Sequence, residues 1–278
     1  MESTTNNIRL KSIKVLGVNV NDYGGNGAPV VFVHSFPLTS KMWDEQVVYF
    51  SDKYRVITYD TRGLGNSFTD DNVYSMEKMV NDFFHIINNL KLPKVHTVGL
   101  SMGGYMLLRA VIKDSERFNS MTLINTKADK DEDEEILKRS SQVIKIKSGG
   151  RDAYLKKLMP NLISENKKEI YEKVKEIINS NTDEGICGNL LALSTRINTL
   201  NLVTKINVPV LLISGTEDLI NPSCKMEQIF STFRENRNKS TLTSLLKMTN
   251  SGHLCNMENP EEFNKFLEWF LKGIEINS

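Results

Sequence analysis

The most constraining feature of the 278-residue chain is a glycine-rich turn between an apolar segment and a helix-forming segment. The apolar segment is Val95–Leu100, and the helix-forming segment is Tyr105–Ile112. The sequence Gly-Leu-Ser-Met-Gly joins them, with Ser101 at its centre. A sharp strand-to-helix turn exposes its central side chain and leaves room only for very small residues two positions away on either side. Ser101 is therefore predicted to be a nucleophile, and an ordinary glycine-rich turn is the alternative.

The composition of the chain argues against several classes of protein. Lys and Arg number 35 and Asp and Glu number 34, so no net field attracts nucleic acid or an anionic membrane. No apolar run approaches membrane-spanning length, and the first twelve residues lack the apolar region of a signal peptide. The cysteines Cys187, Cys224 and Cys255 are too few and too scattered for a disulfide framework or a zinc site. We expect a cytoplasmic enzyme without a metal.

Strand-like and helix-like patterns alternate at both ends of the chain. Two β patterns, near Ile8–Val15 and Val18–Tyr23, predict a hairpin. Apolar runs typical of buried strands follow at Val30–His34, Arg55–Asp60, Val95–Leu100, Ser120–Asn125, Val208–Gly215 and Leu242–Met248. Helical patterns lie at Met76–Leu90, Pro222–Phe233 and Pro260–Lys272. Strands separated by helices predict an α/β fold with a mostly parallel, eight-stranded sheet flanked by helices.

The strand signal disappears between residues 127 and 205. This stretch contains several charged amphipathic helix patterns, interrupted by Gly149-Gly150 and by Pro160. We predict a helical cap of residues 127–205, inserted after the sixth strand into a core of residues 1–126 and 206–278. The acidic run Asp129–Glu135 and the basic cluster Lys138–Lys147 are expected to neutralise each other along a solvated helix, and a partner site is the alternative.

A serine nucleophile needs a base, and the base needs an orienting acid. Of the four histidines, His85 and His96 fall inside a helical and a strand pattern and are expected to be structural. His34 ends a strand, directly before a loop. His253 lies in a glycine-containing loop between the last strand and the last helix, from which it can reach over the C-terminal edge of the sheet. His253 is the predicted base.

The predicted acid is Asp218, three residues after Gly215 at the end of a strand. The resulting chain order of Ser101, Asp218 and His253 is the order expected for a serine on this kind of turn. An aspartate that forms a turn before a helix is the structural alternative. Asp129, which follows the preceding strand, is a rival acid.

Two backbone N–H groups would stabilise the negative charge that develops on a substrate oxygen. One belongs to Met102, directly after the nucleophile, and the other to Phe36, in the loop after the third strand. The side chains of Phe36 and Met102 are expected to line the substrate pocket. Arg196, at the end of the cap, is a further candidate for substrate contact. Arg62 could hold a substrate carboxylate, but tying its own loop together is the preferred interpretation.

With these features in place, the chain resembles the α/β-hydrolase fold family over nearly its whole length. Asp60–Ser67 is similar to the family's D-x-R-G-x-G-x-S loop, and Glu258-Asn259-Pro260 matches the region after the histidine. Within the family, the chain is most similar to the 3-oxoadipate enol-lactonases and their esterase and cofactor-free haloperoxidase relatives. The segments that carry this likeness are Phe36-Pro37-Leu38, Met42-Trp43, Gly99–Tyr105 and Asn125–Asp129.

Two departures from the family pattern concern the site. His34-Ser35 replaces the usual His-Gly pair, which places a Cβ atom beside the predicted Phe36 donor. Lys127 stands where an arginine is common in the enol-lactonases.

The resemblance implies a serine hydrolase that cleaves a small carboxylic ester or lactone through an acyl-enzyme intermediate, with no cofactor. The alternatives are a cofactor-free haloperoxidase or perhydrolase, a C–C bond hydrolase on the same triad, and a non-catalytic ligand-binding protein that keeps the fold. A small-molecule substrate is the only partner that the sequence predicts.

Overall fold

An eight-stranded sheet forms the centre of the computed structural model, which describes residues 9–68, 73–235 and 242–276. The strands are β1 (Lys11–Val15), β2 (Val18–Asp22), β3 (Pro29–Val33), β4 (Arg55–Tyr59), β5 (Val95–Leu100), β6 (Phe118–Ile124), β7 (Val210–Gly215) and β8 (Thr243–Met248). Their order is β1-β2-β4-β3-β5-β6-β7-β8. The β1–β2 and β2–β4 pairs are antiparallel and the other pairs are parallel, which confirms the predicted sheet. Ile8, in the predicted hairpin, lies outside the described residues.

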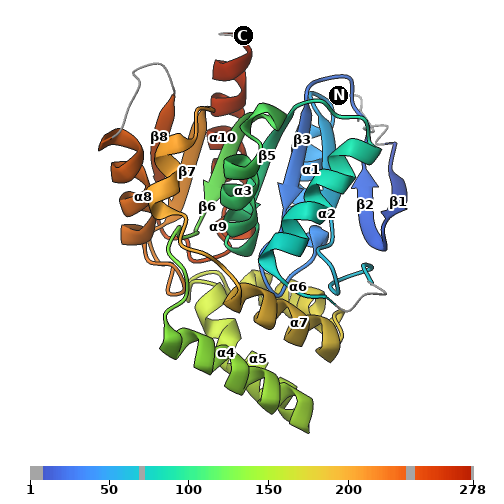
Figure 1. Cartoon of the computed structure of the whole chain (residues 1–278), viewed down its shortest axis with the longest axis vertical. Helices are drawn as coiled ribbons and strands as arrows, with labels where there is room; N and C mark the ends of the chain where they lie inside the picture. Colours follow the sequence, from blue (N-terminus) through green and yellow to red (C-terminus); the bar gives the residue numbers. More distant parts are fainter. Residues whose placement is uncertain (1–8, 69–72, 236–241, 277–278) are drawn as a thin grey trace.

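Helices cover both faces of this sheet (Figure 1). On one face lie α1 (Asp44–Phe50) and α10 (Pro260–Glu275), and on the other lie α2 (Met76–Asn89), α3 (Met102–Lys113) and α8 (Ser223–Glu235). The remaining helical elements of the core are α9 (Cys255–Glu258), η1 (Ser40–Trp43) and η2 (Ser115–Arg117).

Local sequence signals explain where two of the longer helices begin. The Ser75 side chain accepts a hydrogen bond from the Lys78 N–H at the start of α2. Asn259 does the same for Glu262 at the start of α10, and Pro260 is the first residue of that helix. Such caps satisfy N–H groups that have no partner within the helix, and proline lacks the N–H that would be unpaired there.

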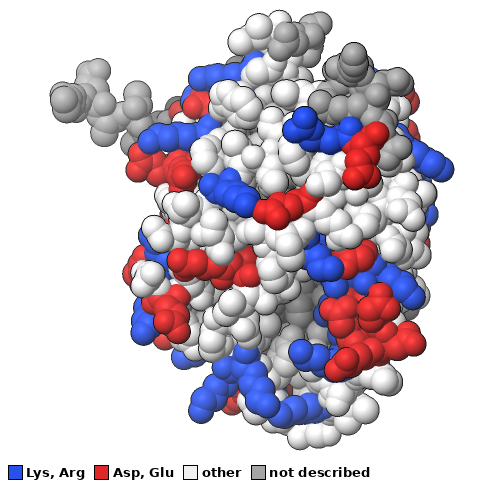
Figure 2. All heavy atoms as spheres, turned by 90° about the vertical axis from the view of Figure 1, so that its left-hand side faces the viewer, with Lys and Arg blue, Asp and Glu red and all other residues white. Residues whose placement is uncertain are grey.

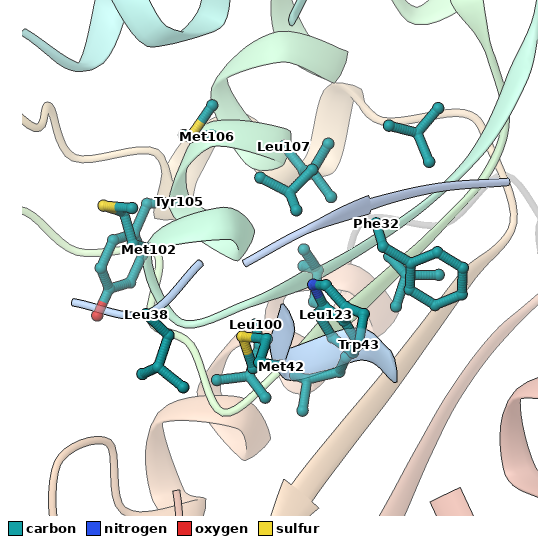
Figure 3. Packing of buried hydrophobic residues seen from close by; sticks show 14 of the residues in the cluster. Phe32, Leu38, Met42, Trp43, Leu100, Met102, Tyr105, Met106, Leu107 and Leu123 are labelled. Carbon is teal, nitrogen blue, oxygen red and sulfur yellow. The ribbon is translucent and has the colours of Figure 1, made fainter. Parts of the chain in front are cut away.

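The core is packed with apolar and aromatic side chains between the sheet and the helices. Every residue of β5 is buried, as its continuous apolar run predicts. Figure 3 shows Phe32 and Trp43 beside each other, and their ring centroids are 5.1 Å apart. Phe263 of α10 also packs against Trp43, with ring centroids 6.2 Å apart. Trp43 therefore links β3 to α10.

A helical cap lies between β6 and β7, beyond the C-terminal ends of the parallel strands (Figure 1). Its elements are α4 (Asp133–Lys145), η3 (Ile146–Gly150), α5 (Arg151–Leu162), η4 (Lys168–Ile170), α6 (Tyr171–Asn179), α7 (Asp183–Ser194) and η5 (Leu200–Lys205). Gly149, at φ 82°, separates α4 from α5 as the sequence predicts.

Pro160 does not interrupt a helix in the way we expected, since it lies inside α5. Pro160 is close to the end of α5, so the helix loses only the one backbone hydrogen bond that proline cannot donate and ends two residues later. None of the helices in the described part of the chain is long and apolar enough to cross a membrane.

Candidate active site

Ser101 stands in the tight turn between β5 and α3, with φ 52° and ψ −109°. Few non-glycine residues adopt a positive φ, and such strain is concentrated at functional sites. Small residues are required around it. A Cβ atom on Gly99 would lie 2.6 Å from the Leu107 side chain, and one on Gly103 would lie 2.2 Å from the Val33 carbonyl oxygen. Both glycines are therefore needed for β5 and α3 to meet at this angle.

Asp218 and His253 form a buried pair. His253 Nδ1 lies 2.9 Å from Asp218 Oδ2, and both side chains are at most 1% exposed. The second carboxylate oxygen, Oδ1, accepts hydrogen bonds from the N–H groups of Ile220 at 2.8 Å and Asn221 at 3.0 Å. A carboxylate at Nδ1 holds the proton on that nitrogen and leaves Nε2 free to act as an acceptor.

The rival acid, Asp129, lies elsewhere. Its Oδ2 accepts a hydrogen bond from Lys225 Nζ at 2.7 Å. Burial alone would raise the pKa of Asp129, but the hydrogen bond and charge of Lys225 lower it overall. Asp129 is thus an ion-pair partner of α8, and the structure brings Asp218 rather than Asp129 to His253.

The other three histidines have surroundings that differ from those of His253. His34 is fully buried, with Nε2 accepting from the Thr61 N–H and Nδ1 donating to the Ser35 carbonyl, each at 2.8 Å. Burial lowers the pKa of His34 and, to about 4, that of His96. His85 is exposed on α2. None of the three lines the cavity beside Ser101 that is described below.

Asn125, directly after β6, joins the loops that carry Asp218 and His253. Its Nδ2 donates to the carbonyl oxygens of Gly252 at 3.0 Å and His253 at 2.9 Å. Its Oδ1 accepts from the Gly215 N–H at 2.8 Å, and its own carbonyl accepts from Asn221 Nδ2 at 2.8 Å. Its φ of 44° lies in the left-handed region, which asparagine tolerates better than most residues. In the sequence, Asn125 stood out only as part of a strand pattern and of a family motif, and its role in joining two loops was missed.

Glu258 was also missed as a site residue, and its carboxylate binds the loop of His253. Its Oε2 accepts from the Gly252 N–H at 2.8 Å, and its Oε1 accepts from the Leu254 N–H at 3.2 Å. The same carboxylate accepts from the Ser164 hydroxyl at 2.7 Å, two residues after the end of α5. Glu258 therefore connects the loop of His253 to the cap.

A cavity of about 780 Å³ opens beside Ser101. Ser101 and His253 both line it, together with Phe36 and Met102. The other lining residues are Tyr105, Glu135, Lys138, Arg139, Ser141, Gln142, Lys145, Tyr154, Lys157, Leu158, Asn161, Leu193, Leu219 and Ile220. No hydrogen bond joins Ser101 to His253 among those of the described residues, and such contacts often tighten only when substrate binds.

The two predicted backbone donors lie at this cavity. Met102 is the first residue of α3, where N–H groups have no partner within the helix. Phe36 follows β3 in a loop where Ser35 is completely buried. The extra side chain of Ser35 is accommodated there, and its hydroxyl lies 3.3 Å from the Phe36 carbonyl oxygen.

Arg196 is not among the residues that line the cavity. Its guanidinium group lies 3.9 Å from the ring centre of Tyr105 and forms an ion pair with Asp131. Arg62 is also held away, by an ion pair of 2.7 Å with Asp82 of α2. Arg62 therefore binds a neighbouring helix, α2, whereas we expected it to hold its own loop together.

The described residues contain no group of three or more His, Cys, Asp or Glu side chains that could hold a metal ion. The sequence model of the alpha/beta hydrolase fold matches residues 28–164. The strand order, the strained serine turn and the cap agree with that match. The chain has the α/β-hydrolase fold.

The proteins that this chain resembles include enzymes of several activities. It is 28% identical to "3-oxoadipate enol-lactonase 2" of Acinetobacter baylyi, over 92% of this chain and 94% of that protein. It is 36% identical to the non-heme chloroperoxidase of Burkholderia pyrrocinia, over 34% of this chain and 35% of that protein. The solved thermophilic esterase of Thermogutta terrifontis is similar at a TM-score of 0.87 and 28% identity, over 95% of this chain and 99% of that one. These likenesses indicate an enzyme.

Proposed function

We propose that the chain is a serine hydrolase that cleaves small carboxylic esters or lactones through an acyl-enzyme intermediate. The observation that carries this proposal is a shared cavity, with Ser101 on its strained turn and His253 in its lining. Asp218 lies behind His253, at 2.9 Å. A ligand-binding protein without catalysis would not need this buried acid–base pair.

In the proposed mechanism, Ser101 Oγ attacks the carbonyl carbon while His253 Nε2 takes its proton. Asp218 stabilises the resulting imidazolium, and the Met102 and Phe36 N–H groups stabilise the oxyanion. The tetrahedral intermediate collapses, and the leaving alkoxide takes the proton from His253. Water then attacks the acyl-enzyme, with His253 acting again as the base, and releases the acid.

Two features support a small substrate. The cavity of about 780 Å³ is bounded by the core on one side and by α4 and α5 on the other. Relatives named as an enol-lactonase and an esterase align over nearly the whole chain.

We propose the division into a core of residues 1–126 and 206–278 and a cap of residues 127–205. A cytoplasmic location stays a prediction.

One alternative has an observation in its favour. The likeness to a non-heme chloroperoxidase keeps peracid formation on the same triad open as a second activity. Halide oxidation that depends on both hydrogen peroxide and a carboxylic acid would identify it. A C–C bond hydrolase on this triad would be recognised by substrate screening.

The test of the proposal is covalent labelling with a fluorophosphonate probe. Only Ser101 should be labelled, and Ser101→Ala should lose both the label and ester hydrolysis, by about four orders of magnitude or more. Ser141→Ala is the matched control, since Ser141 also lines the cavity but lies on α4. Full hydrolysis by Ser101→Ala would overturn the mechanism.

A further inference from the structure

The roof and the floor of the cavity differ in chemistry. Near the turn, the lining is largely apolar or aromatic, with Phe36, Met102 and Tyr105. The roof comes from α4 and α5, and most of its lining residues are polar or charged: Glu135, Lys138, Arg139, Ser141, Gln142, Lys145, Lys157 and Asn161. In Figure 2 the cap forms the lower end of the molecule, and Lys and Arg side chains gather there on this face.

Two charged residues of the roof already have ion-pair partners within the protein. Glu135 accepts from Lys127 Nζ at 3.1 Å, and Arg139 forms an ion pair of 2.5 Å with Asp131. Burial alone would raise the pKa of Asp131, but the hydrogen bond and charge of Arg139 lower it overall, so Asp131 stays anionic. Neither charge is available to a ligand in the cavity.

The remaining charged roof residues are Lys138, Lys145 and Lys157. They have no ion-pair partner within the described part of the chain. Lys138 and Lys145 are seven positions apart, which places them on one side of α4, and Lys157 lies on α5. Three positive charges without an ion-pair partner, all lining one cavity, favour an anion there.

We infer that the substrate carries an anionic group, a carboxylate or a phosphate, remote from the scissile carbonyl, and that Lys138, Lys145 and Lys157 recognise it. This inference rests on the proposed hydrolase function. The carbonyl lies at Ser101 against the apolar floor, and the anion points toward the cap. The buried cations Arg62 and Arg196 are occupied by Asp82 and Asp131 and take no part.

Flexible lysine side chains are sufficient to recognise the anionic group when several of them act together. Exposed ion pairs are individually weak, and each changes an equilibrium by about fivefold at most. Three of them acting on one group, beside a partly enclosed cavity, are expected to produce a preference of about tenfold or more. Their effect is screened by salt, so the preference must fall as ionic strength rises.

The experiment compares three activated esters of similar length. Mono-4-nitrophenyl glutarate carries a carboxylate, 4-nitrophenyl 4-phosphonobutanoate carries a phosphonate in place of a phosphate, and 4-nitrophenyl pentanoate is neutral. In the wild type at low salt, kcat/KM for one of the two anionic esters should exceed that for the neutral ester by about tenfold. The better of the two anionic esters identifies the anion.

The variant that tests the residues combines Lys138→Gln, Lys145→Gln and Lys157→Gln. It should lose the anionic preference mainly through a higher KM, while hydrolysis of the neutral ester stays within about twofold. The charge-matched control combines Lys130→Gln, Lys156→Gln and Lys168→Gln, all exposed and outside the cavity lining. The control should keep the preference, and its loss there would overturn the assignment.

Failure of this inference can be told from failure of the proposed function. Hydrolysis of the neutral ester that depends on Ser101, with no anionic preference in the wild type, would refute the anion site alone. If no ester is hydrolysed, the hydrolase proposal fails and calorimetry with glutarate and with 3-phosphonopropionate decides the anion site. Weaker binding of either by the triple variant than by the control supports the site, and equal binding of both overturns it.

Discussion

A single backbone conformation determines what Ser101 can do. Its positive φ turns the chain from β5 into α3 and leaves its side chain at the cavity. Gly103 lets α3 approach β3 so closely that a Cβ atom would overlap the Val33 carbonyl oxygen. Asn125 similarly holds the Asp218 and His253 loops together, because its buried side-chain amide bonds to both. Strain and close packing here are compensated by hydrogen bonds from neighbouring strands.

Substitution of Asp218 and of Asp129 should affect catalysis very differently. Asp218→Asn should leave the fold intact but lower kcat by about 10⁴, because the amide holds His253 in the wrong tautomer. Asp129→Asn should change kcat little, since Asp129 pairs with Lys225. Steady-state kinetics with an ester, alongside circular dichroism, measures both. The reverse pattern would assign the acid to the end of β6.

The pairing of β5 with β6 buries a titratable group in the middle of the sheet. His96 is 3% exposed, and its Nδ1 lies 2.8 Å from the Ser120 hydroxyl. Burial lowers its pKa from 6.5 to about 4, because the charged ring would lose its hydration. The folded protein therefore binds fewer protons than the unfolded chain between these two pH values, and its stability rises with pH across that range.

Acid sensitivity follows from this shift. Between pH 6.5 and pH 4, His96 should cost the wild type up to about 3 kcal/mol of unfolding free energy, with no further loss from this group below pH 4. His96→Gln should show a shallower decline in urea unfolding over that range, and the slope that remains includes the buried His34. His85→Gln, on an exposed position of α2, is the control and should keep the full slope. Equal slopes in both variants would contradict the assignment.

The cap and the core together enclose the cavity beside Ser101. Neither part encloses the cavity alone, since its lining comes from the serine turn and the His253 loop on one side and from α4 and α5 on the other. Glu258 ties the two parts together by accepting a hydrogen bond from Ser164. Excluding water strengthens the electrostatic interactions of a site and positions the reacting carbonyl.

A substrate series tests this enclosure. Short acyl esters and five- or six-membered lactones should be cleaved well, and kcat/KM should fall for long-chain esters because α4 and α5 limit the room beyond Ser101. The measurement is kcat/KM across p-nitrophenyl esters of rising chain length, beside the lactones. A steady rise to long chains would indicate an open, lipase-like groove.

Local patterns in the chain were sufficient to predict the sheet, the order of its helices and the serine turn. Continuous apolar runs, helical periodicity and the glycines at 99 and 103 act over a few residues, so they can be read without knowing the fold. Even so, Pro160 shows that a helix-breaking residue near a helix end does not mark an interruption. His253 and Asp218 were predicted from their places after strands, and their contact is a consequence of the parallel sheet.

Only the tertiary structure decided which polar side chains are free and which are occupied. Arg196 was a candidate for substrate contact in the sequence, but it is buried and paired with Asp131. Asn125 and Glu258 carried no local signal for these contacts, because Asn125 binds the distant Asp218 and His253 loops and Glu258 binds the distant Ser164. The sequence alone determined which chemical groups follow each strand, since that depends on neighbouring residues. The partners of these groups depend on how the strands and the cap pack against each other, and that packing joins residues that are far apart in the chain.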